Sequence, residues 1–272
     1  MTSKKREQIR NYFTKRKPSP SEIMIEEMLT RFAIFFILGS FLIRFILVFT
    51  NSGAISIFLI LLIFGVSLLK LKKFYFSKEL IFTTRYADIP EEQTVDAWLI
   101  DDIEDLKERS IRRLNINKAE LIRDSIVIRG PILWSTNGIP SQDLLWKKGK
   151  DQHIRFSINT ITVIHLTDYG ISSYQCDFNF LKGVPLNERD DEFHYRDVVA
   201  VSTRDDSTNY RLPNNVLIRH AQLFKLSVSS GDSIQVVINS SELLKFTGGT
   251  ILDTGLDSAI RTLRKVLNQK KS

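Results

Sequence analysis

An almost uncharged run of 38 residues lies between Arg31 and Lys70, and Arg44 is the only ionisable residue within it. The run contains two apolar stretches, Phe32–Thr50 and Ile55–Leu69, separated by the turn-forming sequence NSGA. At about 1.5 Å rise per residue, each stretch nearly crosses a hydrocarbon core of about 30 Å. Neither stretch has the polar face of a helix in a water-soluble protein. The run therefore predicts a transmembrane helical hairpin rather than a buried core hairpin.

Positive charge is concentrated around this run. Residues 1–78 carry 13 Lys and Arg against 4 Asp and Glu, whereas residues 79–272 carry 25 against 27. The positive-inside rule then places both termini in the cytoplasm, which predicts a multi-pass protein of a bacterial inner membrane. Lys70, Lys72 and Lys73 follow the run directly and are candidates for contact with anionic lipid headgroups. Because the rest of the chain is not basic, no nucleic-acid partner is expected despite the overall charge of +7.

Arg44 is the candidate functional residue of the predicted hairpin. A cation inside a transmembrane helix costs a few kcal/mol, so it needs a partner, a water path or a short route to the interface. Arg44 precedes Thr50 by six residues, roughly 9 Å along a helix, so one alternative is that its side chain reaches the membrane surface. The other is that Arg44 lines a polar interior with Ser40, Ser56 or Ser67 when hairpins assemble, which predicts a homo-oligomer.

The periodicity after the hairpin changes from helical to strand-like. Apolar residues recur at helical spacing in Glu91–Leu114, which predicts a connector helix. Ile171–Phe180 alternates between apolar and polar residues, which predicts a strand with one buried and one wet face. Phe224–Ile238 alternates on both sides of the turn SSGD, which predicts a hairpin. A last apolar stripe from Leu256 to Leu267 predicts a closing amphipathic helix.

These patterns predict an α+β membrane protein in four parts. Residues 1–31 form a basic cytoplasmic segment and residues 32–69 the two-helix transmembrane hairpin. Residues 70–114 contain a juxtamembrane segment and the connector helix. Residues 115–272 form a cytoplasmic β-rich domain, an antiparallel barrel or sandwich closed by the C-terminal helix.

No motif for catalysis or for binding a cofactor is present. The single cysteine, Cys176, is expected to be structural, and no phosphate-binding loop occurs. The acidic sequence from Glu188 to Glu192 has the composition of a solvated loop rather than of a metal site. The four histidines are scattered singly, without the spacing of zinc ligands: His153, His165, His194 and His220. The chain is therefore not expected to be an enzyme; a hydrolase remains an alternative only if folding brings acids or histidines together.

Two segments of the β-rich part resemble a known group of domains. Phe193–Val201 is similar to a strand common in bacterial pleckstrin-homology-like domains attached to transmembrane hairpins, and Ala259–Leu267 is similar to their closing helix. The overall layout also resembles two-transmembrane effectors of bacterial antiphage signalling, whose cytoplasmic β-barrel binds a cyclic nucleotide. Neither resemblance transfers a ligand-contact residue to this chain.

The leading functional hypothesis is a membrane-anchored, non-enzymatic sensor and effector. Its β domain is expected to bind a small molecule, such as a nucleotide, or a protein, and to control the assembly of the hairpin. The alternative is a membrane-tethered scaffold that binds a protein partner or a lipid headgroup without disturbing the bilayer.

Overall fold

The computed structural model describes residues 2–15, 20–50, 63–70, 89–134, 138–212, 215 and 217–271. The chain divides into two compact units. The first, which we call the β-rich unit, joins Met1–Phe13 to Pro90–Ser272, and the second, the helical unit, is Thr14–Ile89. The N-terminal helix thus belongs with the C-terminal two thirds of the chain, and the helical unit is inserted between them.

The elements follow one another in this order: α1 (Thr2–Thr14), α2 (Pro20–Thr50), α5 (Glu92–Arg113), η1 (Lys118–Glu120), β1 (Ile126–Ile132), η2 (Ser141–Asp143), β2 (Trp146–Lys148), β3 (His153–Phe156), β4 (Ile158–Leu166), β5 (Gly170–Asn179), β6 (Val184–His194), η3 (Tyr195–Asp197), β7 (Val198–Arg211), β8 (Leu217–Val228), β9 (Ser233–Asn239), α6 (Ser241–Thr247), β10 (Thr250–Ile251) and α7 (Leu256–Lys271).

The described strands of the β-rich unit form three sheets. One has the strand order β1-β4-β5-β6 and another the order β7-β8-β9, and both are antiparallel throughout. The small third sheet, β10-β3-β2, contains a parallel pair, β10 and β3. Strands β1 and β9 approach so closely that a side chain on Gly130 would collide with the carbonyl oxygen of Val237.

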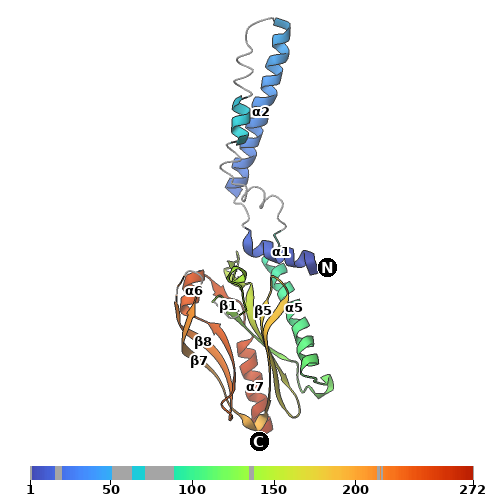
Figure 1. Ribbon diagram of the computed structural model, residues 1–272, viewed down its shortest axis with the longest axis vertical. Coiled ribbons are helices and arrows are strands. Elements are labelled where there is room, and N and C mark those ends of the chain that lie inside the picture. Colours follow the sequence, from blue (N-terminus) through green and yellow to red (C-terminus); the bar gives the residue numbers. More distant parts are fainter. Residues whose placement is uncertain are drawn as a thin grey trace. The chain divides into compact units, whose positions relative to one another are not determined.

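Helices cover both sides of the four-stranded sheet (Figure 1). Helix α7 lies between the two larger sheets and adds Ala259, Leu263 and Val266 to the main core. Helix α5 lies on the opposite face of the four-stranded sheet. Strands β4 and β5 are consequently buried on both faces, and even Ser173 is fully buried. The expected wet face of the strand at 171–180 is therefore wrong, although the strand itself is confirmed.

Several local predictions are confirmed. The connector helix is α5, the hairpin is the antiparallel pair β8 and β9, and the closing helix is α7. Two others are wrong. The acidic stretch expected to be a loop lies within strand β6, and the strand expected at Phe193–Val201 is interrupted by the 3₁₀ turn Tyr195–Asp197.

The predicted antiparallel barrel is also wrong, because the strands form three separate open sheets. The alternating pattern from residue 115 onward correctly indicated antiparallel pairing, but the pattern does not contain the information that decides whether the first and last strands meet.

Within the helical unit, α2 packs against the helical residues 63–70. The rings of Phe36 and Phe64 lie 4.9 Å apart in an edge-to-face arrangement. Gly65 makes the close approach possible, because a Cβ there would lie 2.9 Å from the side chain of Ile37. Many large apolar side chains of this pair remain exposed: Met24, Ile25, Met28, Phe32, Ile34, Phe35, Leu38, Phe41, Ile63, Phe64, Val66 and Leu69.

None of the helices in the described residues has both the length and the apolar composition needed to cross a membrane. The prediction of a multi-pass inner-membrane protein with a transmembrane hairpin over residues 32–69 is therefore wrong.

Candidate functional site

The N-terminal helix α1 is docked on the β-rich unit through one apolar face. Ile9, Tyr12 and Phe13 are buried, with Ile9 and Tyr12 at most 1% exposed. Their spacing of three and four residues places them on one side of a helix. Basic residues lie beside this face, so α1 combines apolar burial with positive charge. We name the surface that contacts α1 the α1 groove. It includes Asp102 of α5, Lys147 of β2, and Phe180 and Gly183, which follow β5. Asp102 is its charged centre.

Asp102 is clamped by two cations of α1. Lys5 Nζ lies 2.9 Å from Asp102 Oδ1, and Arg6 Nη1 lies 2.6 Å from Asp102 Oδ2. Arg6 Nη2 donates a second hydrogen bond to Oδ1 at 2.9 Å, and Nη1 also donates to the carbonyl oxygen of Phe180 at 3.1 Å. The Asp102 side chain is only 5% exposed. A buried carboxylate needs such partners, because an unpaired charge at this position would be strongly unfavourable.

The close fit of Arg6 depends on a glycine. Gly183 follows β5 with a φ of +69°, in the left-handed region that favours glycine. A Cβ on Gly183 would collide with the guanidinium group of Arg6. The turn after β5 is therefore shaped to admit the side chain that holds Asp102.

Tyr12 anchors the other end of α1 but is not fully satisfied. Lys147 Nζ donates a hydrogen bond of 2.6 Å to the carbonyl oxygen of Tyr12 and lies 4.5 Å from the centre of its ring. The Tyr12 hydroxyl is buried and has no hydrogen-bond partner among the described residues. Burial raises the pKa of Tyr12 to about 12, and neighbouring Glu92 and Asp96 act in the same direction. An orphaned hydroxyl costs about 1–3 kcal/mol, so α1 docks less tightly than its apolar contacts would allow.

Beside Tyr12 lies a second ionic cluster, centred on Arg155 of β3. The Arg155 side chain is 4% exposed and forms fork-like hydrogen bonds of 2.7 and 2.6 Å to Asp96 of α5. It also bonds Asp151 at 2.7 and 3.1 Å. Burial alone would lower the pKa of Arg155, but these hydrogen bonds raise it well above its usual value. The hydrogen bonds from Arg155 also lower the pKa of Asp151 to about 2, so Asp151 is ionised at neutral pH.

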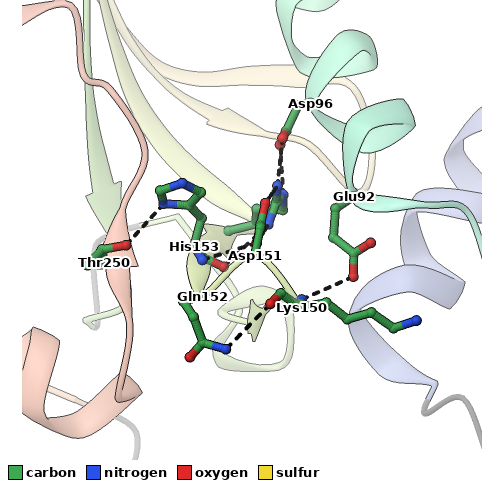
Figure 2. A network of polar contacts seen from close by, with 8 residues as sticks. Glu92, Asp96, Lys150, Asp151, Gln152, His153 and Thr250 are labelled. Carbon is green, nitrogen blue, oxygen red and sulfur yellow. Dashed lines mark hydrogen bonds and ion pairs between the residues drawn. The ribbon is translucent and has the colours of Figure 1, made fainter.

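Figure 2 shows how the loop before β3 is pressed against α5. Asp96 and Glu92 point from α5 toward the loop, and Glu92 accepts a hydrogen bond of 3.4 Å from the backbone of Lys150. His153 Nδ1 lies 3.0 Å from the hydroxyl of Thr250, which ties the loop to β10. The N-terminal part of α5 is thereby fixed to the loop and to β3, and β3 is bonded in turn to β10.

A small cavity lies beside the Arg155 cluster, with Asp96 and Arg155 in its lining. It has a volume of about 30 Å³, and its lining includes Phe13 of α1, Leu99 of α5, Arg129 of β1 and Phe156 of β3. A cavity of this size holds about one water molecule. The junction of α1, α5 and the sheets therefore contains an unfilled space beside Phe13.

The C-terminal end of α5 borders a larger groove. The helix ends in a Schellman motif, in which Ile116 N–H bonds the carbonyl oxygen of Ile111 at 3.0 Å and Asn115 adopts a φ of +51°. The adjoining groove has a volume of about 360 Å³, and its lining includes Asn115, Tyr169, Glu192 and His194. This volume is within the range of small-molecule sites.

Two polar contacts fix this end of α5 to the sheet. Arg109 forms a fork-like ion pair with Glu188 of β6, with both hydrogen bonds at 2.8 Å. Ser110 Oγ donates to the carbonyl oxygen of Lys107, so the His165 ring, 2.7 Å away, donates from Nε2 to Ser110. Nδ1 of His165 then accepts from Ser125 Oγ at 2.8 Å. Burial lowers the pKa of His165 to about 4, so this fully buried ring is neutral and structural.

The candidate residues of the sequence analysis lie away from this junction. Arg44 belongs to the backbone of α2, but its side chain is outside the described part of the chain. Lys70 is exposed at the end of the helical residues 63–70, and Lys72 and Lys73 lie outside the described residues. Their predicted roles are therefore not tested. Cys176 is buried, and burial raises its pKa to about 12, which confirms the structural role expected for it.

Sequence reasoning missed Lys5, Arg6 and Asp102. Charge counting assigns the two cations to a membrane flank, and in the sequence Asp102 is one of several acids on α5. The signal that was available is the spacing of Ile9, Tyr12 and Phe13, which indicates an apolar face on a segment that also carries charge.

The described residues contain no group of three or more His, Cys, Asp or Glu side chains arranged to hold a metal ion. The arrangement at the junction binds α1 through ion pairs, hydrogen bonds and apolar burial. Comparison with known proteins finds no matching family model, no similar curated protein and no similar solved structure.

Proposed function

We propose that this chain is a non-enzymatic regulatory protein whose β-rich unit binds a ligand and controls the assembly of the helical unit. One observation carries the proposal: α1 and α5, which precede and follow the helical unit in the sequence, are held together on Asp102. The segments that precede and follow the helical unit in the sequence thus meet at one buried carboxylate. In the proposed mechanism, release of α1 separates these two segments.

The helical unit has a surface suited to assembly. The large apolar side chains exposed on α2 include Phe35, which is 70% exposed, and Leu38, which is 63% exposed. Contiguous apolar surfaces of this kind mark interaction sites in proteins. In the proposed mechanism the docked α1 restrains association through this surface, and its release permits association.

A ligand can shift this equilibrium only if it binds the two arrangements with different affinity. The groove at the C-terminal end of α5 is the proposed ligand site, because its lining includes Leu114 and Asn115, which end the helix that carries Asp102. In the proposed mechanism a small molecule bound there shifts α5 as one rigid element, and so changes the position of Asp102 relative to Phe180, the other group that holds Arg6.

The proposal is tested with Asp102→Asn, which keeps the shape of the side chain and removes its charge. Asp101→Asn is the matched control, because Asp101 is the neighbouring residue on α5 and is exposed. Hydrogen exchange of the α1 amides and the mass distribution by light scattering are measured on the same samples. We expect faster exchange in α1 and a larger assembled fraction for Asp102→Asn only. Faster exchange in α1 with an unchanged mass distribution would refute the proposal.

A further inference from the structure

We infer that the α1 groove also accepts α1 from a second copy of the chain, so that assembled copies exchange their N-terminal helices. This inference rests on the proposed function and names the partner that the released α1 meets. The occupant is defined by the contacts already described: two cations for Asp102, an aromatic ring for Lys147 and an apolar face.

First, no covalent bond within the β-rich unit holds α1 in the groove of its own copy. Its contacts with α5, β2 and the end of β5 are ion pairs, hydrogen bonds and apolar packing. The only chain connection runs through Thr14–Ile89, which forms a separate compact unit. Each contact would therefore be the same if another copy supplied the helix, and exchange of an identical element is a low-cost route to association.

Second, the charge of the groove is complementary to that of α1. Asp102 accepts hydrogen bonds from Lys5 and Arg6, so a helix that covers it must bring matching cations, because burial under an unmatched helix would leave the carboxylate unpaired. The first residues of α1 provide Lys5 and Arg6 at the required separation from Tyr12. An acidic or neutral helix cannot satisfy Asp102 in the same way.

Third, two features of the junction favour the release of α1. The Tyr12 hydroxyl is buried without a partner, and the junction contains the 30 Å³ cavity beside Phe13. Both features weaken the docked state relative to a fully packed interface. The exposed apolar side chains of α2 then bring copies together, which raises the local concentration of foreign grooves around a released helix.

A charge-exchange experiment on the full-length chain distinguishes docking within one copy from docking between copies. The first variant carries Lys5→Glu and Arg6→Glu, and the second carries Asp102→Arg. Neither can dock its own α1, because each places like charges together. In a mixture, the acidic helix of the first fits the Arg at position 102 of the second, and the basic helix of the second fits the Asp102 of the first. The triple variant, with all three substitutions in one chain, is the matched control for docking within one copy.

The readout is hydrogen exchange of the α1 amides, which reports docking independently of any association through α2. We expect at least tenfold slower exchange in the mixture than in either variant alone. Protection in the triple variant without protection in the mixture would overturn the inference. If Asp102→Asn still enlarges the assembled fraction in that case, the proposed function stands while the exchange fails.

A second measurement uses the unaltered sequence and so does not depend on the folding of a variant. Equal amounts of ¹⁴N- and ¹⁵N-labelled chain are mixed at a concentration that gives assembled protein and are treated with a zero-length carbodiimide cross-linker. Lys5 and Asp102, 2.9 Å apart, are the target pair. Cross-linked peptides that combine the two isotopes, at up to half of the total, would support exchange. Cross-linked peptides of one isotope only would contradict it.

Discussion

Arg6 of α1 and Asp102 of α5 form a two-pronged ion pair between residues 96 positions apart in the sequence, with hydrogen bonds of 2.6 and 2.9 Å. The pair joins the segment before the helical unit to the segment after it. Because Asp102 is 5% exposed and Arg6 is 19% exposed, solvent can replace neither partner completely. This relationship makes the docking of α1 measurable through single substitutions.

Asp102→Ala is expected to lower the free energy of unfolding of the β-rich unit by about 2–3 kcal/mol. The loss lies below that of a fully buried pair, because Lys5 and Arg6 are partly exposed and can turn toward water. Urea denaturation followed by far-UV circular dichroism measures the change. Asp101→Ala, on the exposed side of the same helix, should stay within about 0.5 kcal/mol of the original chain. Equal losses for the two variants would argue against the clamp.

Tyr12→Phe is expected to stabilise the docked α1 by about 1 kcal/mol, because it removes a buried hydroxyl that has no partner. Hydrogen exchange of the α1 amides should slow by roughly fivefold. Tyr169→Phe provides the control, since Tyr169 is 76% exposed and its hydroxyl is accessible to water. Faster exchange in Tyr12→Phe would mean that the hydroxyl has a favourable contact after all.

Arg155→Lys is expected to destabilise the β-rich unit by about 2 kcal/mol although the charge is retained. Lysine cannot reproduce the fork-like hydrogen bonds to Asp96 and Asp151. The pKa of Asp151, now about 2, should move toward its ordinary value, which NMR titration of the carboxyl group detects. Arg204→Lys is the comparison, because Arg204 forms an ion pair on the surface and is 48% exposed. An unchanged Asp151 pKa in Arg155→Lys would contradict this account.

His165 should make the chain less stable in mild acid. Its pKa is about 4 in the folded state, below the ordinary value of 6.5, so the unfolded chain binds more protons between these pH values. Stability contributed by the neutral ring is complete above pH 6.5 and falls by up to about 3 kcal/mol as the pH drops to 4. Urea denaturation at several pH values should show a flatter profile for His165→Gln than for His220→Gln, in which an exposed histidine is replaced. Parallel profiles would exclude a contribution from His165.

Much of the local structure of the β-rich unit could be predicted from the sequence. Helices α5 and α7 and the β8-β9 hairpin follow from the spacing of apolar residues, which reports which face of an element is buried. The acidic composition of strand β6 predicts a loop, but in the structure its acids Glu188 and Asp190 pair with Arg109 and Arg113 of α5. Those partners lie more than 70 residues away in the sequence, so the composition of the stretch alone cannot reveal that its acids are paired.

The α1 junction could not be predicted, for a related reason. Charge counting treated Lys5 and Arg6 as part of one basic flank, although their partner is a carboxylate in the middle of α5. The apolar run after Arg31 dominated that interpretation. Only the three-dimensional placement of Asp102 beside Phe180 shows that the two cations form ion pairs and hydrogen bonds within the β-rich unit.

We propose that the docking of α1 controls the assembly of the helical unit. The mass distribution of three variants tests this proposal most directly. Light scattering at one protein concentration should give a larger assembled fraction for Asp102→Asn than for the original chain, a smaller one for Tyr12→Phe, and no change for Asp101→Asn. If Asp102→Asn and Tyr12→Phe change the exchange of the α1 amides in opposite directions but leave the assembled fraction equal, the claim is contradicted.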